Sequence, residues 1–220
     1  MSRLIVFGCS LAYGVGLPDC WPNISKPSKF CWPELVAQTM NRELVNKSAP
    51  GSSNKGIWYT ISKFKFESDD VVIISWSYPN RYSIINNPWD IRNLHNNLTE
   101  DTASMAFYEH LYSYYDTIVM SKLYADDANK ILIEKNIPVY NLTVEKHYRY
   151  LTLGQHNTVP LYMGEYEESY PKALDKDHLG LDGHKVFAAD FMNYIGVKHT
   201  LTDLLKPYSI FKQLKNIICK

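Results

Sequence analysis

Short apolar runs that end in turn residues alternate along this chain with longer segments of helical periodicity. The runs at residues 4–7, 43–46, 71–74 and 137–142 predict strands. Runs that are apolar throughout, such as 4–7 and 71–74, are typical of parallel strands buried on both faces.

Apolar positions recur at helical spacing in the segments between these strands. They predict helices over residues 29–41, 55–66 and 183–195, and one long helix or two in series over 103–136. Ser28 has the position of an N-cap for the first of them. Strands that alternate with helices, without an internal repeat, predict a parallel-sheet α/β domain.

Polar or aperiodic segments interrupt this alternation. Residues 17–29 are rich in Pro, Asn and Ser and predict a surface loop. Residues 82–102 and 143–174 predict insertions within one domain that spans residues 1–220, and the pattern of 197–220 is ambiguous.

Charge and composition exclude several classes of function. Lysine plus arginine equals aspartate plus glutamate, 23 each, so we expect no nucleic-acid partner, and the basic residues at 212–220 form only a short tail. No apolar run has membrane-spanning length and no signal peptide precedes the first strand, so we expect a cytoplasmic protein without a membrane partner. The four cysteines lack metal-type spacing and predict free thiols, although spacing alone leaves a Cys20–Cys31 bridge open.

Two polar clusters carry candidate chemistry. Ser10 follows the first strand after the turn residue Gly8, where open α/β sheets bind their ligands. Asp175 and His178 are three residues apart, so a turn brings their side chains together and the carboxylate can fix the imidazole tautomer. A plain turn at Ser10 and a helix-capping role for His178 are the structural alternatives.

These clusters belong to a series of blocks that resembles the SGNH, or GDSL-type, hydrolases, and most of all their compact phage and bacterial members. The matching blocks, in the family's order, are Gly8-Cys9-Ser10, Trp32-Pro33-Glu34-Leu35, Asn46-x-Ser-Ala-Pro-Gly51-x-Ser-Asn54, the strand 71–75, Asp175-x-x-His178 and Gly183-His184. The resemblance implies a three-layer α/β/α sandwich with a parallel, flavodoxin-like sheet.

The resemblance also implies a catalytic site without metal or cofactor. Ser10 would be the nucleophile, His178 the general base and acid, and Asp175 its orienting partner. Backbone N–H groups of Ser10 and Gly51 would bind the oxyanion.

The third block departs from the family pattern, which usually places an Asn donor after the strand. Here the strand runs into Trp76-Ser77-Tyr78-Pro79-Asn80-Arg81, so Asn80 is the candidate donor, with Asn54 as the weaker substitute. The other alternative is a site with two backbone donors alone. Asp177 competes with Asp175 as orienting residue, and His184 is the rival histidine, with a structural role favoured by its position in a helix.

Together these features predict a serine esterase or acyl hydrolase that acts on a small-molecule or carbohydrate ester. The aromatic residues Trp76, Tyr78, Tyr82 and Trp89, flanked by Asn and Arg, predict a shallow sugar platform and a preference for short acyl esters, unless they only pack the insertion. The alternatives are a non-catalytic module that binds a glycan or a protein, and a phosphodiester or sulfate-ester hydrolase. If the source is a phage, we expect association with the virion. The sequence fixes no oligomeric state.

Overall fold

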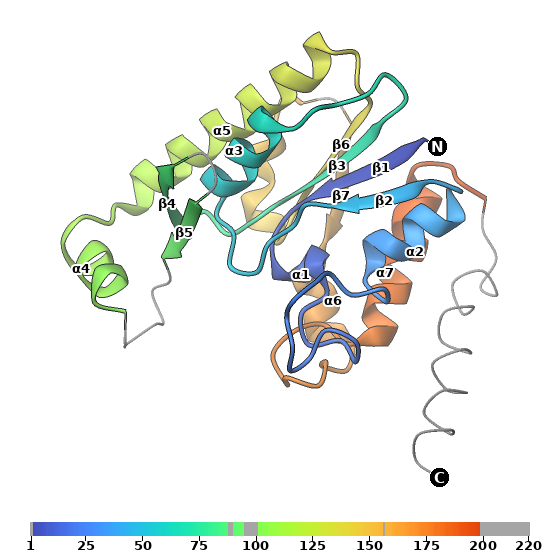
Figure 1. The fold of residues 1–220 in the computed structure, drawn as a ribbon, viewed down its shortest axis with the longest axis horizontal. Helices are drawn as coiled ribbons and strands as arrows, with labels where there is room; N and C mark the ends of the chain where they lie inside the picture. The colour runs from blue at the N-terminus through green and yellow to red at the C-terminus, as the bar shows by residue number, and fades with distance from the viewer. Residues whose placement is uncertain (1, 88–89, 95–100, 156, 199–220) are drawn as a thin grey trace.

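The computed structural model describes residues 2–87, 90–94, 101–155 and 157–198 (Figure 1). The expectations for Trp89, Cys219 and the tail from residue 199 onward lie outside the described residues. The single domain over 1–220 therefore stays a prediction. In the described part of the chain, no helix is long and apolar enough to cross a membrane.

A five-stranded parallel sheet forms the centre of the described structure (Figure 1). Its strands are β1 (Arg3–Phe7), β2 (Glu43–Asn46), β3 (Val71–Trp76), β6 (Val139–Thr143) and β7 (Thr158–Tyr162). The order is β2-β1-β3-β6-β7 with every neighbouring pair parallel. This is the flavodoxin-like order of doubly wound folds, so the predicted fold class is confirmed.

Helices cover both faces of the sheet and make three layers (Figure 1). On one face α2 (Trp32–Thr39) packs against α7 (Leu181–Tyr194), and on the other α3 (Asn54–Lys63) packs against α5 (Tyr114–Glu134). The central strands are enclosed between them: every residue of β3 is buried. Burial on both faces explains why β1 and β3 are apolar without alternation.

The predicted helices form with shifted starts. The region 103–136 divides into α4 (Thr102–His110) and α5, and Ser113 caps α5 by accepting a hydrogen bond from Asp116 N–H at 3.3 Å. Ser28 does not cap α2, which begins at Trp32; its hydroxyl instead accepts from Phe30 N–H at 3.0 Å and donates to Asp19. Ser28 therefore stabilises a turn ahead of the helix.

The first predicted insertion contains an antiparallel hairpin rather than an irregular segment. Its strands are β4 (Tyr82–Asn87) and β5 (Asp90–Leu94). Buried Ser83 binds Asn93 Oδ1 within the hairpin and Ser53 Oγ at the start of α3, each at 2.6 Å. The Ser and Asn residues that predict turns are thus used to fasten the hairpin to the helix layer.

The second predicted insertion contributes to the central sheet, which corrects the expectation for residues 143–174. It contains a 3₁₀ helix, η1 (Lys146–Thr152), then β7 and α6 (Met163–Ser169). Strand β7 lies at the edge of the sheet, pairs with β6 through a register shift and includes exposed Pro160. A short, irregular edge strand with proline has no clear sequence pattern.

Cys9, Cys20 and Cys31 are buried free thiols, so the Cys20–Cys31 bridge is not formed.

Candidate active site

Ser10 lies at the carboxyl edge of the sheet, at the first residue of the short helix α1 (Ser10–Tyr13). Its side chain is almost fully buried. Glycine at position 8, just before Ser10, lets α1 and β3 pack closely against the backbone, because a Cβ there would lie 3.0 Å from Ala12 Cβ and 3.2 Å from Ser75 Cβ. The sheet order reverses between β1 and β3, and such a switch point is where doubly wound folds bind ligands.

Asp175 and His178 are joined within one turn. The Asp175 Oδ2 atom lies 2.7 Å from His178 Nδ1, while Oδ1 accepts the backbone N–H groups of Asp177 and His178, each at 3.1 Å. Lys176 has a φ of 64°, which bends the chain so that these two N–H groups face the carboxylate. A carboxylate at Nδ1 stabilises the tautomer with its proton there and leaves Nε2 as a base.

The Asp175 carboxyl is held in its charged form. Burial raises its pKa, but the hydrogen bonds from Asp177 and His178 outweigh burial, so the net pKa lies below the usual value. The carboxylate therefore stays available to orient the imidazole. Asp177 instead directs its backbone N–H at Asp175 and places its side chain on the wall of the adjacent pocket.

The loop after α1 packs closely against the turn that carries Asp175 and His178. Gly16 has a φ of +84°, and a Cβ on it would lie 2.6 Å from the Asp175 carboxylate atoms. The Gly16 carbonyl accepts the Leu174 N–H at 3.0 Å. Glycine at this position thus lets the segment that carries Ser10 and the segment that carries His178 meet.

A pocket of about 160 Å³ joins the two segments. It is lined by Ser10 and Leu11 of α1, Tyr78 and Arg81 after β3, Glu167 of α6, and Lys172, Asp177 and His178 of the turn. Within the described residues, no direct hydrogen bond links Ser10 to His178. Such bonds are often long in unliganded enzymes and tighten when substrate binds.

The two predicted oxyanion residues beyond Ser10 do not line this pocket. Gly51 has a φ of +72° in the turn after β2, and Asn80 offers its carbonyl to the Tyr108 hydroxyl at 2.8 Å. Their oxyanion roles stay predictions. Asn54 is buried and binds the backbone of Ser77 on both sides, accepting its N–H at 2.7 Å and donating to its carbonyl at 3.1 Å. Its amide is therefore used to fix the loop after β3.

Arg81 enters the sequence analysis only as a flank of the predicted sugar platform, and Leu11, Glu167 and Lys172 were missed there as pocket residues. Arg81 follows a strand end, a position that favours a role in the site, whereas Glu167 and Lys172 lie in the aperiodic segment. Burial raises the pKa of Glu167, against the opposing effect of nearby Lys172. Burial and the nearby Glu167 also raise the pKa of Tyr78, which keeps its hydroxyl protonated.

The predicted aromatic platform does not form as a unit. Trp76 is fully buried in β3 and donates its indole N–H to Asn141 Oδ1 at 3.0 Å. Tyr82 stacks on Phe107 with ring centroids 4.4 Å apart. Among the described members of this group, only Tyr78 lines the pocket. Trp76 and Tyr82 instead pack within the fold.

His184 has a structural position. Its side chain is buried in α7, and Nδ1 accepts the Trp32 backbone N–H at 3.1 Å. Burial lowers the pKa of His184 to about 3, so the ring is neutral. The bond ties the start of α2 to α7.

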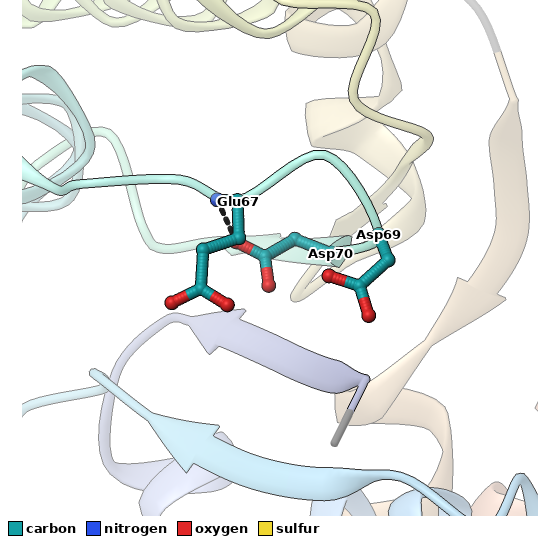
Figure 2. A group of neighbouring side chains, drawn as sticks. All are labelled: Glu67, Asp69 and Asp70. Atoms are coloured by element: carbon teal, nitrogen blue, oxygen red, sulfur yellow. Dashed lines mark hydrogen bonds between the residues drawn. The ribbon is translucent and has the colours of Figure 1, made fainter.

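An acidic cluster lies just before β3, at the amino ends of the strands, whereas the pocket lies at their carboxyl ends. Figure 2 shows Glu67, Asp69 and Asp70 side by side, with the Glu67 N–H donating to Asp70. Arg3 binds both oxygens of Asp70 at 2.8 and 2.7 Å and Glu67 at 2.9 Å. Arg3 already binds two of the three carboxylates, so we assign the cluster to the fold rather than to a metal.

The fold has clear counterparts among solved structures. TesA matches with a TM-score of 0.57 at 11% identity, over 88% of this chain and 97% of its own. The lipase Lip_vut3 from a goat rumen metagenome matches with 0.56 at 13% identity, over 88% and 97%. An acetyl xylan esterase, Est2A from Butyrivibrio proteoclasticus, matches with 0.53 at 11% identity, over 88% and 62%.

No protein-family model and no curated protein matches the sequence. At such low identity the structural matches establish the architecture. The order of the sheet, the layers and these matches agree with the resemblance of the sequence blocks: the chain has the fold of the SGNH hydrolases.

Proposed function

We propose that this chain is a cofactor-independent serine esterase. The observation that carries the proposal is the bond between Asp175 and His178 Nδ1 at 2.7 Å, beside a pocket that His178 shares with Ser10. A serine, an oriented imidazole and a buried carboxylate around one cavity are the requirements of nucleophilic acyl transfer. Esterases and lipases among the structural matches support this class of reaction.

In the proposed reaction, Ser10 Oγ attacks the carbonyl carbon of an ester and its proton passes to His178 Nε2. The carbonyl π bond opens to a tetrahedral oxyanion, which collapses as the C–O bond to the alcohol breaks. His178 gives its proton to the departing alcohol. Water then repeats the sequence on the acyl-enzyme and releases the acid, and Ser10 recovers its proton.

The pocket favours a short acyl group on a polar alcohol. Four of its lining side chains are charged, namely Arg81, Glu167, Lys172 and Asp177, and its volume is about 160 Å³. A long acyl chain needs a continuous apolar cleft, whereas charged and amide groups bind hydroxyl-rich alcohols. We propose acetyl esters of a carbohydrate as the substrate class, a choice that the acetyl xylan esterase among the matches supports.

Hydrolysis of p-nitrophenyl acetate tests the proposed activity. Wild-type protein is expected to turn the ester over, and Ser10→Ala is expected to lose that turnover. Ser62→Ala is the matched control, because this exposed hydroxyl only bonds the Tyr59 carbonyl within α3 and should leave the rate unchanged. Activity that survives in Ser10→Ala would contradict the proposal, and a folded but inactive wild type would favour a non-catalytic binding module.

A further inference from the structure

We infer that Arg81 supplies the side-chain hydrogen bond to the oxyanion that forms on Ser10. The inference rests on the proposed esterase function and adds a residue to that site. Acyl transfer places a negative charge on the former carbonyl oxygen, and fixed donors aimed at that charge lower the barrier most. The loop after β3 sends two side chains to the Ser10 pocket, those of Tyr78 and Arg81.

The guanidinium of Arg81 is held in place before any substrate binds. Its Nη1 donates to Ser77 Oγ at 3.1 Å, and its Cζ lies 4.8 Å from the centroid of the Tyr78 ring. Arginine carries five N–H donors, so the bond to Ser77 leaves others for a ligand. A cation stacked on an aromatic face also loses little freedom when it binds.

Ser77 is itself held by Asn54, a residue distant in the sequence. Asn54, at the start of α3, binds the backbone N–H and carbonyl of Ser77 at 2.7 and 3.1 Å. Asn54 and Ser77 are both buried, so water does not compete for these bonds. The chain of contacts Asn54–Ser77–Arg81 therefore positions the guanidinium without any help from substrate, which is the property that electrostatic catalysis requires.

The proposed step balances within the esterase reaction. As Ser10 Oγ bonds to the carbonyl carbon, the π electron pair moves to oxygen and an Arg81 N–H donates to that oxygen. His178 holds the serine proton until the C–O bond breaks and then gives it to the departing alcohol oxygen. When the pair returns and the alcohol leaves, the hydrogen bond to Arg81 weakens again, and Arg81 keeps all of its protons.

The alternative donor in the loop is the Tyr78 hydroxyl, and the alternative role for Arg81 is to bind an anionic substituent of the substrate. The two roles of Arg81 differ kinetically. An oxyanion donor acts in the transition state and changes kcat with neutral esters, whereas a substrate anchor changes KM and only for acidic esters.

The test compares Arg81→Gln, Arg81→Lys, Tyr78→Phe and Lys55→Gln by steady-state kinetics on a neutral acetyl ester and on an ester with a free carboxylate. Lys55 is the matched control, because its ammonium lies 5.1 Å from the ring centroid of Tyr82, at the start of β4, and outside the Ser10 pocket. Circular dichroism and thermal unfolding show that each variant is folded.

We expect Arg81→Gln to lower kcat about 100- to 1,000-fold on both esters with little change in KM, as loss of one oxyanion donor does. Arg81→Lys should recover part of this loss, and Lys55→Gln should match wild type. Unchanged kcat in Arg81→Gln, a change confined to KM for the acidic ester, or a large loss only in Tyr78→Phe would overturn the inference.

Failure of the esterase proposal would look different. In that case wild type would show no Ser10-dependent turnover, and both proposals would fall together. An active, Ser10-dependent wild type with an unaffected Arg81→Gln overturns the role of Arg81 alone.

Discussion

At the scale of single residues, the site depends on how one carboxylate is tied down. Asp175 uses one oxygen for His178 Nδ1 and the other for two backbone N–H groups. Its neighbour Asp177 faces the pocket instead. The two carboxylates are close in sequence but have different surroundings. Replacing each by its amide therefore separates the orientation of the His178 ring from the negative charge beside the pocket.

We predict that Asp175→Asn lowers kcat about 1,000- to 10,000-fold, because the amide favours the wrong imidazole tautomer. Asp177→Asn removes a carboxylate from the pocket wall but leaves the Asp177 N–H to bond Asp175, so its loss should be far smaller. Turnover of one acetyl ester by both variants checks this. Equal losses, or a larger loss for Asp177→Asn, would assign the orienting role differently.

A second residue-scale prediction concerns pH. The pKa of buried His184 is lowered to about 3 from 6.5, so below pH 6.5 the unfolded chain binds a proton that the folded chain does not. The free energy of unfolding should therefore be fully retained above pH 6.5 and fall as the pH drops toward 3. His184→Asn, which can keep an acceptor for Trp32 N–H, should show a shallower fall.

Urea unfolding across this pH range measures the effect. The control is His110→Asn, because the His110 side chain is 66% exposed at the end of α4. It should follow the wild-type curve. Identical pH dependence of wild type and His184→Asn would show that His184 does not resist protonation in the folded state.

Single residues also show how far a sequence can be interpreted. The spacing of Asp175 and His178 is local, so a turn was enough to predict their contact. The candidate oxyanion donors lie in loops whose course depends on distant partners: the Asn54 amide binds the Ser77 backbone, and Arg81 rather than Asn80 lines the pocket. Such long-range use of a side chain has no signature in the residue itself.

At the scale of elements, two glycines with similar backbone angles allow a clean comparison. Gly16 and Gly154 have φ values of +84° and +78°, and a Cβ would strike Asp175 at 2.6 Å in the first but meet nothing within 4 Å in the second. We predict that Gly154→Ala costs about 1 kcal/mol of stability from backbone strain alone, with kcat unchanged.

Gly16→Ala should cost more stability and also lower kcat, because the added methyl group must displace a carboxylate held by three hydrogen bonds. Thermal unfolding and ester kinetics on the two variants make the test. Full activity in Gly16→Ala would mean that the turn can move without disturbing His178.

Elements with a strong internal pattern were predicted and those without one were not. Strands β1 and β3 are apolar at nearly every position because they are buried on both faces. In α3 and α7 the apolar residues recur at helical spacing, so the sequence indicates the buried side of each helix. Only one residue of β7 is buried and the strand contains exposed Pro160, while the hairpin of β4 and β5 consists largely of polar residues. These strands therefore lack the apolar pattern of a core element.

At the scale of the whole molecule, the fold places the pocket where strand order reverses, and loops decide its chemistry. The charged lining predicts a substrate preference: rates on p-nitrophenyl esters should fall from acetate and butyrate to octanoate and palmitate, and acetylated xylo-oligosaccharide should release acetate. Rates that climb toward long chains, with no acetate released from the sugar, would reject this substrate class.

The central claim is that Ser10 is the nucleophile, and covalent labelling tests it most directly. A fluorophosphonate reacts only with a serine that its own site activates. The wild-type protein, treated with the probe, digested and mapped by mass spectrometry, should carry one adduct on Ser10, and Asp175→Asn should label far more slowly. An adduct on another serine, or no adduct while a control esterase reacts, would contradict the account.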